Sequence, residues 1–209
     1  MIRPPGFRGA AFGDAASGNG RDDLGRRSAI SRELGISEDW AFVTQVHGGI
    51  VLNVDEPGSA GEADGMIADR PGLPITIATA DCMPIIVEGD RSVAILHAGW
   101  RGVASGIVTS GVEAMRALGD TPRRAAIGPS IGPCCYEVGE EVRDAIGDHR
   151  SQTAFGTPSV DLWSAAAAQL AGIDVWRSDL CTYTEPGMRS YRRDATTKRQ
   201  VAVAWLPEI

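Results

Sequence analysis

Three side chains that could hold a metal ion, or act as nucleophile and base, come directly after apolar runs of the chain. His47 and His97 are two of only three histidines, and Cys82 is one of four cysteines. Each histidine precedes glycine or Ala-Gly, and Cys82 has the equivalent position after residues 75–80. A packed sheet can bring three strand ends to one point, and glycines beside them allow close approach. We therefore predict one shared site rather than a buried structural cysteine and two separate core histidines.

The donor set restricts the chemistry of such a site. Two imidazoles and one thiolate suit Zn²⁺, and three protein ligands leave a fourth position for water or substrate, as in catalytic zinc sites. The same set suits type-1 Cu²⁺ with Met83 as axial ligand, but neighbouring residues on a strand point in opposite directions. A third interpretation needs no metal, with Cys82 as nucleophile and His97 or His47 as its base. A purely structural zinc site would usually have four protein ligands.

Groups that could bind an anion or move a proton lie beside these candidate ligands. Arg101 follows His97 by four positions and precedes a helix expected over 103–118. Its guanidinium and the backbone N–H groups at the helix start would form an anion site. Asp81 is the nearest candidate for a general acid. The segment 127–136 contains two Ile-Gly-Pro units, which indicate a rigid loop that could line a pocket.

Short and almost wholly apolar runs predict strands that are covered on both faces. These runs are residues 75–80, 84–87, 92–97, 125–128 and 201–206. Two further strand-like runs, 40–46 and 50–54, flank His47-Gly48-Gly49, and the glycine pair predicts a hairpin between them. The first 27 residues are interpreted as loop with one short strand.

Helices are expected between these strands. One apolar stripe with helical spacing predicts a single helix over 103–118. Others are expected over 138–146 and from the N-cap Asp161 to Leu170, with a short one between Ser28 and Gly35. Strands interleaved with helices predict an α/β class with a layered mixed sheet. We expect a single domain over residues 1–209, of which 1–39 form a variable N-terminal segment.

Composition excludes several classes of function. The 209 residues are 43% apolar and 22% charged, as in an ordinary globular domain. A net charge of −7 with scattered basic residues argues against a nucleic-acid partner, although a local arginine pocket could still bind a small anion. We expect no membrane span, because no run approaches about 20 apolar residues. The start lacks a secretory signal and the cysteine spacing matches no disulfide scaffold, so the cytoplasm is the expected compartment.

Six segments, in chain order, resemble the laccase-domain family, which is also called multicopper polyphenol oxidoreductase and more recently purine nucleoside phosphorylase. They are Gln-Val-His-Gly at 45–48, Ala-Asp-Gly at 63–65, Thr-Ala-Asp-Cys-Met-Pro at 79–84, His-Ala-Gly-Trp-Arg-Gly at 97–102, the loop 127–136, and Ser-Tyr-Arg-Arg-Asp at 190–194. The resemblance covers roughly residues 40 to 206.

The resemblance implies a mixed α/β fold of stacked layers and a Zn²⁺ bound by the residues that match His47, Cys82 and His97. It also implies phosphorolysis of adenosine, inosine, guanosine and methylthioadenosine, with adenosine deamination as a further activity. Purine nucleosides and phosphate would then be the partners, with Arg101 and Arg8 as the candidate phosphate ligands. The alternatives are a metal-free Cys/His hydrolase or amidase and a copper polyphenol oxidoreductase. Three histidines are few for a multicopper oxidase.

Overall fold

Two stacked β-sheets form the centre of the computed structural model, which describes residues 1–208. The first sheet has the order β1-β13-β6-β2-β4, with the bounds β1 (Ala10–Phe12), β13 (Gln200–Ala204), β6 (Ile75–Thr79), β2 (Ala41–Thr44) and β4 (Gly58–Glu62). The second has the order β12-β9-β7-β8-β5-β3, with the bounds β12 (Asp174–Arg177), β9 (Pro122–Ile127), β7 (Met83–Gly89), β8 (Val93–Ala98), β5 (Gly65–Ala68) and β3 (Val51–Asn53). Both sheets are mixed, since each contains parallel and antiparallel pairs.

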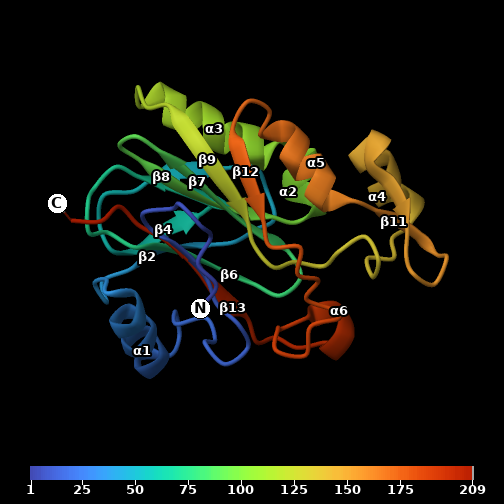
Figure 1. Ribbon diagram of the computed structural model, residues 1–209, viewed down its shortest axis with the longest axis horizontal. Coiled ribbons are helices and arrows are strands. Elements are labelled where there is room, and N and C mark those ends of the chain that lie inside the picture. The colour runs from blue at the N-terminus through green and yellow to red at the C-terminus, as the bar shows by residue number, and fades with distance from the viewer. Residues whose placement is uncertain (209) are drawn as a thin grey trace.

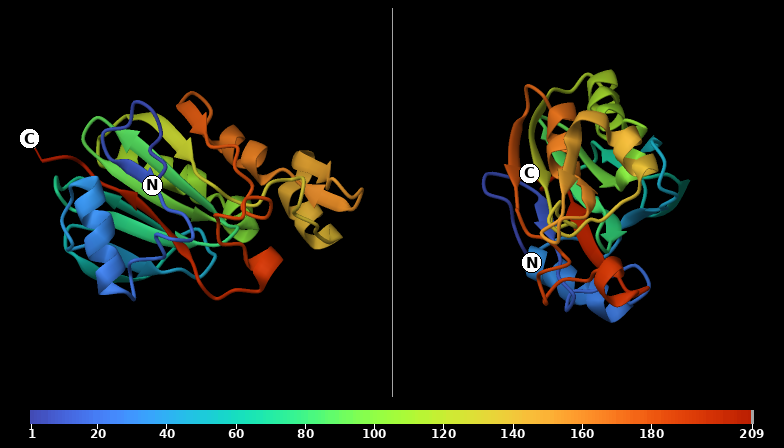
Figure 2. Two further views of the ribbon diagram at one scale, coloured as in Figure 1. Left: turned by 60° about the horizontal axis from the view of Figure 1, so that its bottom comes forward. Right: turned by 90° about the vertical axis from the view of Figure 1, so that its right-hand side faces the viewer.

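Helices cover the outer faces of the two sheets (Figures 1 and 2). The second sheet is covered by α2 (Trp100–Ala104), α3 (Ile107–Ala117) and α5 (Leu162–Gln169), and α4 (Glu140–Ile146) lies beside the hairpin of β10 (Arg150–Gln152) and β11 (Pro158–Val160). On the other side, α1 (Leu24–Leu34) packs on the first sheet through Ile30 and Leu34, which contact Trp40 and Val203 in one buried cluster. The predicted class, a single α/β domain of layered mixed sheets, is confirmed.

The apolar strands predicted from the sequence form the core between these layers. Ile75 and Ile77 of β6 meet Ile86 of β7 and Ile95 of β8 in one cluster, and all four are at most 2% exposed. These strands bury both faces, as their continuous apolar runs predict. Segment 1–39 is part of this architecture, because β1 pairs with β13 in antiparallel register.

The predicted hairpin around His47 is wrong. Strand β2 belongs to the first sheet and β3 to the second, so the chain crosses between the sheets at this point. The backbone N–H groups of Val46, His47 and Gly48 donate to the carboxylate of Asp64 instead of to a partner strand. His47 itself has a positive φ of 63°, which turns the chain out of the strand.

Two helix predictions also need correction. The helix expected over 103–118 is broken into α2 and α3 at Gly106, whose φ of 76° is left-handed and ends the first helix. At this break the carbonyl of Val103 accepts the backbone N–H of Gly106 at 3.0 Å and the side-chain amide of Gln169 at 2.9 Å. Helix α1 begins at Leu24 with Asp23 as its N-cap, not at Ser28, because the Asp23 side chain accepts the backbone N–H of Arg26.

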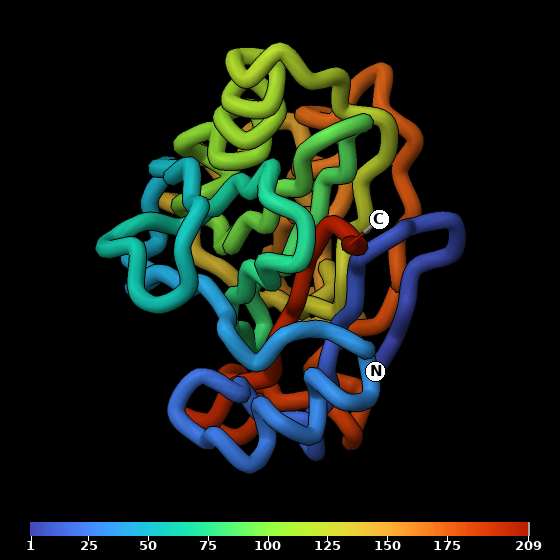
Figure 3. Tube along the Cα trace, turned by 90° about the vertical axis from the view of Figure 1, so that its left-hand side faces the viewer, coloured from blue at the N-terminus to red at the C-terminus, as the bar shows by residue number. Residues whose placement is uncertain are grey.

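Segments from both ends of the chain gather at one end of the molecule (Figure 3). The backbone N–H of Ala15 donates to Gly187 at 2.8 Å, and that of Val201 donates to Gly18 at 2.9 Å. The short helix α6 (Tyr191–Asp194) belongs to this end. Within residues 1–208, no helix combines the length and the apolar character that crossing a membrane requires.

Candidate metal centre and its pocket

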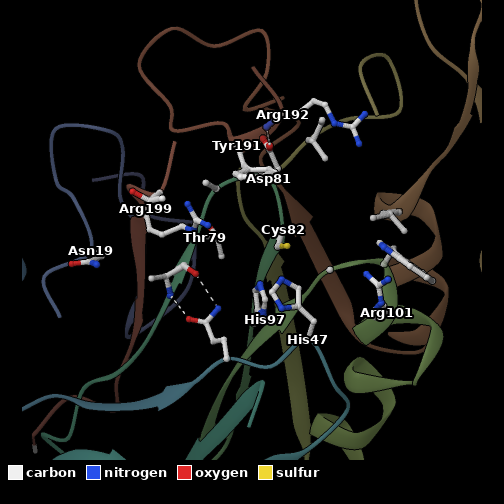
Figure 4. Close-up of a pocket in the computed structure, with 18 of the residues that line it drawn as sticks. Asn19, His47, Thr79, Asp81, Cys82, His97, Arg101, Tyr191, Arg192 and Arg199 are labelled. Carbon is white, nitrogen blue, oxygen red and sulfur yellow. Dashed lines mark hydrogen bonds between the residues drawn. The ribbon is translucent and has the colours of Figure 1, made fainter. Parts of the chain in front are cut away.

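His47, Cys82 and His97 converge on one point, as the sequence predicts. Each offers a ligand atom, and these atoms all lie within 4.8 Å of one another. His47 follows β2, Cys82 lies between β6 and β7, and His97 is buried in β8. Figure 4 shows the three side chains directed toward each other from different parts of the chain. The two imidazole rings are edge to face, with centroids 4.8 Å apart.

Asp64 holds the backbone of His47 and the ring of His97 by hydrogen bonds. Its fully buried carboxylate accepts the backbone N–H groups of His47 at 2.9 Å and Gly48 at 2.6 Å, and it pairs with Nδ1 of His97 at 2.8 Å. Burial acts against ionisation, but these hydrogen bonds hold the pKa of Asp64 below its usual value. A carboxylate on one ring nitrogen of a histidine is the common support of a metal ligand, since it leaves the other nitrogen for the metal.

The charges within the three residues favour a cation. Burial opposes ionisation of the Cys82 thiol, but the charge of His97 and hydrogen bonds from both histidines lower its pKa to about 6. Burial would lower the pKa of His97, yet the Cys82 thiolate and Asp64 raise it to about 9. The three residues thus hold a thiolate next to a protonated imidazole, and a metal ion can replace that proton.

The surroundings also fit a metal ion. A Cβ at Gly99 would lie 3.1 Å from Sγ of Cys82 and 3.5 Å from Cδ2 of His47, so only glycine leaves this space free. The side chain of Met83 is 1% exposed and belongs to the core between β7 and the outer helices, where it packs with Ile85. An axial thioether from Met83 would have to leave that core, which disfavours a type-1 copper geometry.

The three residues line a pocket of about 790 Å³, and several arginines line the same pocket. Its wall includes Arg21 from the N-terminal segment, Arg101 from α2, Arg192 from α6 and Arg199 near β13. Asn19, Asp81 and Tyr191 line it as well, and Figure 4 shows these residues on the side away from Arg101. A pocket with several guanidinium groups attracts anions despite the acidic chain.

Arg101 has the place that the sequence predicts, in the pocket next to the metal ligands. Its guanidinium carbon lies 4.2 Å from the ring centroid of Trp100, a cation–π contact that holds the side chain. Helix α2 has only five residues, so its dipole adds little, and anion binding here depends on the guanidinium itself.

Asp81 lines the same pocket with both carboxylate oxygens in use. Oδ1 accepts the hydroxyl of Thr182 at 2.6 Å, and Oδ2 accepts the backbone N–H of Arg192 at 2.7 Å. Its φ of 87° is left-handed, and its carbonyl accepts the N–H of Ile131 at 2.9 Å. Asp81 therefore joins the metal side of the pocket to two loops of the C-terminal half.

A family model described as multi-copper polyphenol oxidoreductase laccase matches residues 10–207. The chain belongs to this family. A protein of Streptomyces griseus named purine nucleoside phosphorylase ORF3 is 37% identical over 214 residues, which cover 95% of this chain and 85% of the relative. Purine nucleoside phosphorylase YfiH of Escherichia coli is 37% identical over 180 residues, covering 79% and 73%. The predicted family is confirmed.

Solved structures agree with the fold of this laccase-family chain. The crystal structure of YlmD from Geobacillus stearothermophilus superimposes with a TM-score of 0.88 at 29% identity, covering 98% of this chain and 94% of that one. The hypothetical protein YfiH of Bacillus licheniformis superimposes with a TM-score of 0.81 at 30% identity, covering 88% and 80%.

The structure does not bring Arg8 to the pocket of this family member. Arg8 lines a separate hollow of about 170 Å³. There its backbone N–H and its Nε donate to the buried Glu88 at 2.8 and 3.3 Å, and Arg124 lies on the same carboxylate at 3.9 Å. A guanidinium engaged in this way supports the strand β7 from outside, so the candidate phosphate ligands in the pocket are other arginines.

Two arginines near the C-terminus, Arg192 and Arg193, donate to backbone carbonyls of neighbouring loops. Arg193 donates to the carbonyls of Thr182 and Met188 at 2.8 and 2.7 Å, which fixes the loop before α6. Arg192 donates to the carbonyl of Glu137 and stands over the ring of Tyr136. Donation from guanidinium groups to backbone carbonyls is a structural role that charge counting does not detect.

Sequence reasoning missed several residues that build this site. They are Asp64, Gln45, Arg21 and Arg199. Gln45 exchanges two hydrogen bonds of 2.9 Å with the backbone of Ala78, which ties the end of β2 to β6. The signal for Asp64 was present in the Ala-Asp-Gly segment at 63–65, whereas nothing local marks Arg21 or Arg199.

Proposed function

We propose that this chain is a zinc-dependent purine nucleoside phosphorylase that cleaves adenosine, inosine, guanosine or methylthioadenosine with inorganic phosphate. The observation that supports it most is the presence of the three metal-ligand candidates and several arginines in one pocket. A volume of about 790 Å³ is in the range of small-molecule sites and suits a nucleoside together with phosphate. The names of the relatives from S. griseus and E. coli point to the same activity.

The donor chemistry favours zinc as the metal. Two imidazoles and a thiolate are borderline-soft ligands, and three of them correspond to the catalytic arrangement of zinc with one open position. His47, Cys82 and His97 would hold the ion, and Asp64 would orient the histidines through the hydrogen bonds described above. Bound zinc would supply a Lewis acid next to the substrate.

In the proposed reaction, an oxygen of phosphate forms a bond to the anomeric carbon of the ribose while the bond from that carbon to the purine nitrogen breaks. The bonding electrons pass to the purine, which takes up a proton as it leaves, and ribose 1-phosphate is the other product. Arg101 would bind phosphate by paired N–H donation and orient it for attack. Asp81, which lines the pocket, is our candidate for positioning the transferred proton.

Adenosine deamination is the second activity in this proposal. Deamination replaces the amino group at purine C6 by water and releases ammonia, so the site must admit a water beside the base. A site with only three protein ligands has room for one. Ammonia release from adenosine, measured with and without phosphate, separates this activity from phosphorolysis.

A metal-free enzyme with Cys82 as nucleophile is the alternative that the structure supports by a specific observation. The pKa of Cys82 is lowered to about 6 in spite of burial, since His97 and His47 stabilise its thiolate. A thiolate beside an imidazolium is the resting state of many cysteine hydrolases and amidases.

One experiment decides between these reactions. Purified protein is assayed with each nucleoside with and without phosphate, after zinc loading, after exhaustive chelation, and after alkylation of a chelated sample. A phosphorylase requires phosphate, yields ribose 1-phosphate and loses activity on chelation. Free ribose formed without phosphate indicates a hydrolase, and activity that survives chelation but is lost on alkylation indicates a cysteine nucleophile, for which Cys82 is the candidate.

A further inference from the structure

A second group of sulfur ligands lies outside the metal centre described above. Sγ of Cys134, Cys135 and Cys181 all lie within 4.8 Å of one another, although Cys181 is far from the other two in sequence. All three are free thiols, with Cys181 buried and the other two half-buried. None of them takes part in the proposed phosphorolysis, and the inference below does not depend on that function.

The backbone is arranged so that the two adjacent cysteines face the same way. Neighbouring residues of an extended strand point in opposite directions, but residues 132–136 form a turn in which Cys135 and Tyr136 both donate N–H to the carbonyl of Gly132, at 3.0 and 3.1 Å. As a result, Sγ of Cys134 lies 3.0 Å from Sγ of Cys135. Adjacent cysteines can bind one ion together only when both sulfurs lie on the same side of the backbone, as they do in this turn.

The third sulfur is supplied by a segment that pairs with this loop. The N–H of Ser130 donates to Leu180 at 3.2 Å, and the N–H of Thr182 donates back to Ser130 at 3.0 Å. This bridge holds Cys181 beside the turn, where its Sγ accepts the N–H of Gly132 at 3.2 Å. Burial opposes the thiolate, but backbone N–H groups keep the pKa of Cys181 below its usual value.

We propose that Cys134, Cys135 and Cys181 form a second metal site, which binds one thiophilic cation, Zn²⁺ or Cu⁺, through three thiolates. Thiolate sulfur is the ligand that these d¹⁰ ions prefer over harder cations. Three bonds of about 2.3 Å would place the sulfurs about 3.8–4.0 Å apart, within the span that the cluster already has. Sγ of Cys134 and Cys135 would separate by about 1 Å, and their remaining thiol protons would pass to solvent on binding.

The position of this site connects it to the wall of the pocket. Tyr136, directly after Cys135, lines the pocket, and Thr182, directly after Cys181, donates its hydroxyl to Asp81. A cation held by the three cysteines would cross-link these two loops. We therefore expect metal binding at the three cysteines to stabilise the fold here. The ligands of the first centre, His47, Cys82 and His97, would stay unchanged.

The test isolates the second site in a Cys82→Ala protein, which lacks the thiolate of the first. Reduced and metal-free protein is titrated with Cd²⁺, whose thiolate charge-transfer absorption reports sulfur ligation, and then with Zn²⁺ and with Cu⁺ against chelators of known affinity. We expect one equivalent to bind with the absorption of several thiolates, and the melting temperature to rise with metal concentration. The chelator competition identifies which of the two natural ions is held more tightly.

The matched control adds Cys134→Ser and Cys135→Ser to the same background, which keeps the size of both half-buried side chains. Its affinity should fall by at least about a hundredfold, and Cys134→Ser alone should lower it by about tenfold or more. Equal melting temperatures of the metal-free proteins show that the fold is retained. The proposal is overturned if Cys82→Ala shows no thiolate absorption or if the control binds as tightly.

Discussion

The two sides of the pocket are built in different ways. On the metal side, His47, Cys82 and His97 stand at or next to strand ends of both sheets, and Asp64 holds both histidines from a fully buried position. On the opposite side, arginines come from loops contributed by both ends of the chain, in residues 19–22 and 191–199. The metal side is fixed by the core, whereas the other side depends on contacts between loops.

This difference separates two properties of the site. Strand ends that are hydrogen-bonded in a packed sheet cannot move independently, so the geometry of the three ligands should survive changes in the loops. The loop side is held by bonds such as the 2.8 Å contact from Ala15 to Gly187, which a surface substitution can weaken. We expect substitutions in the core to change the metal affinity and substitutions in the loops to change the substrate preference.

The largest effect is expected from removing a ligand on the metal side. Cys82→Ala should lose one equivalent of zinc and reduce nucleoside phosphorolysis below about a hundredth of the wild-type rate, because loss of a ligand exceeds the effect of losing its support. Elemental analysis measures the loss of zinc, and chromatography of the products measures the rate of phosphorolysis. Zinc bound at the three cysteines of the second site would be retained. Full zinc retention and full activity together would remove Cys82 from the site.

Substitution of Asp64, which hydrogen-bonds two of the metal-ligand candidates, should have the next largest effect. Asp64→Asn places an amide where the carboxylate accepts several N–H groups, so we expect zinc affinity to fall by about ten- to a hundredfold. The metal-free variant should lose about 2–3 kcal/mol of stability at neutral pH, since buried donors lose their charged acceptor. Urea unfolding and competition with a zinc chelator report the two effects. A variant with unchanged zinc affinity would show that the histidines hold their orientation without Asp64.

The same pair of proteins gives a pH dependence. The folded-state pKa of Asp64 lies below its unfolded value of about 3.9, so its contribution is complete above that value and is lost as pH falls through the folded pKa. The difference in unfolding free energy between wild type and Asp64→Asn should therefore be constant between about pH 5 and pH 6 and shrink in more acidic solution. It should also shrink as pH rises from about 6.5 to 9, because His97 then loses the proton that Asp64 stabilises. A difference that grows as pH falls below about 5 would contradict the assignment.

The sequence predicted the metal side better than the loop side, for a physical reason. Continuous apolar runs mark buried strands, so 75–80, 84–87 and 92–97 were located correctly and the ligands at their ends followed. The crossing at His47 was not predictable, because it depends on Asp64, a residue that only the fold brings near. Glycine pairs indicate a turn but do not say which sheet the next strand joins.

The loop side lacks any local pattern of this kind. Arg199 and Arg21 reach the pocket only because segments from the two chain ends pack together, a contact between residues that are nearly the whole chain apart. Arg8 shows the opposite case, since it was a candidate phosphate ligand in the sequence, while the fold pairs it with Glu88. Long-range contacts decide which of these arginines reach the pocket, and the charge of a side chain alone cannot predict it.

Among the arginines of the pocket, Arg101 of α2, next to the metal ligands, is the residue with the largest expected effect. Arg101→Lys should raise the phosphate concentration needed for half-maximal cleavage by about tenfold or more, because lysine cannot reproduce paired guanidinium donation. Zinc content and melting temperature should stay the same, since Arg101 is exposed and its guanidinium lies over the neighbouring Trp100 ring. A phosphate titration of both proteins measures the shift. Loss of zinc in the variant would instead mean that Arg101 supports the metal ligands rather than binding phosphate.

The smallest effect on activity is expected at Arg8, which tests where the phosphate site ends. Arg8→Ala removes the Nε contact to Glu88 and the guanidinium hydrogen bonds to the carbonyls of Gly89 and Asp90. The buried Glu88 carboxylate keeps the backbone N–H of residue 8 at 2.8 Å and stays 3.9 Å from Arg124. Because the Arg8 side chain is nearly half exposed, the loss of stability should be about 1 kcal/mol or less. Phosphate dependence should equal that of the wild type, measured in the same titration as Arg101→Lys. A tenfold weaker use of phosphate by Arg8→Ala at unchanged stability would mean that this arginine leaves Glu88 when substrate binds, and the loop side of the pocket would then extend beyond the residues that line it here.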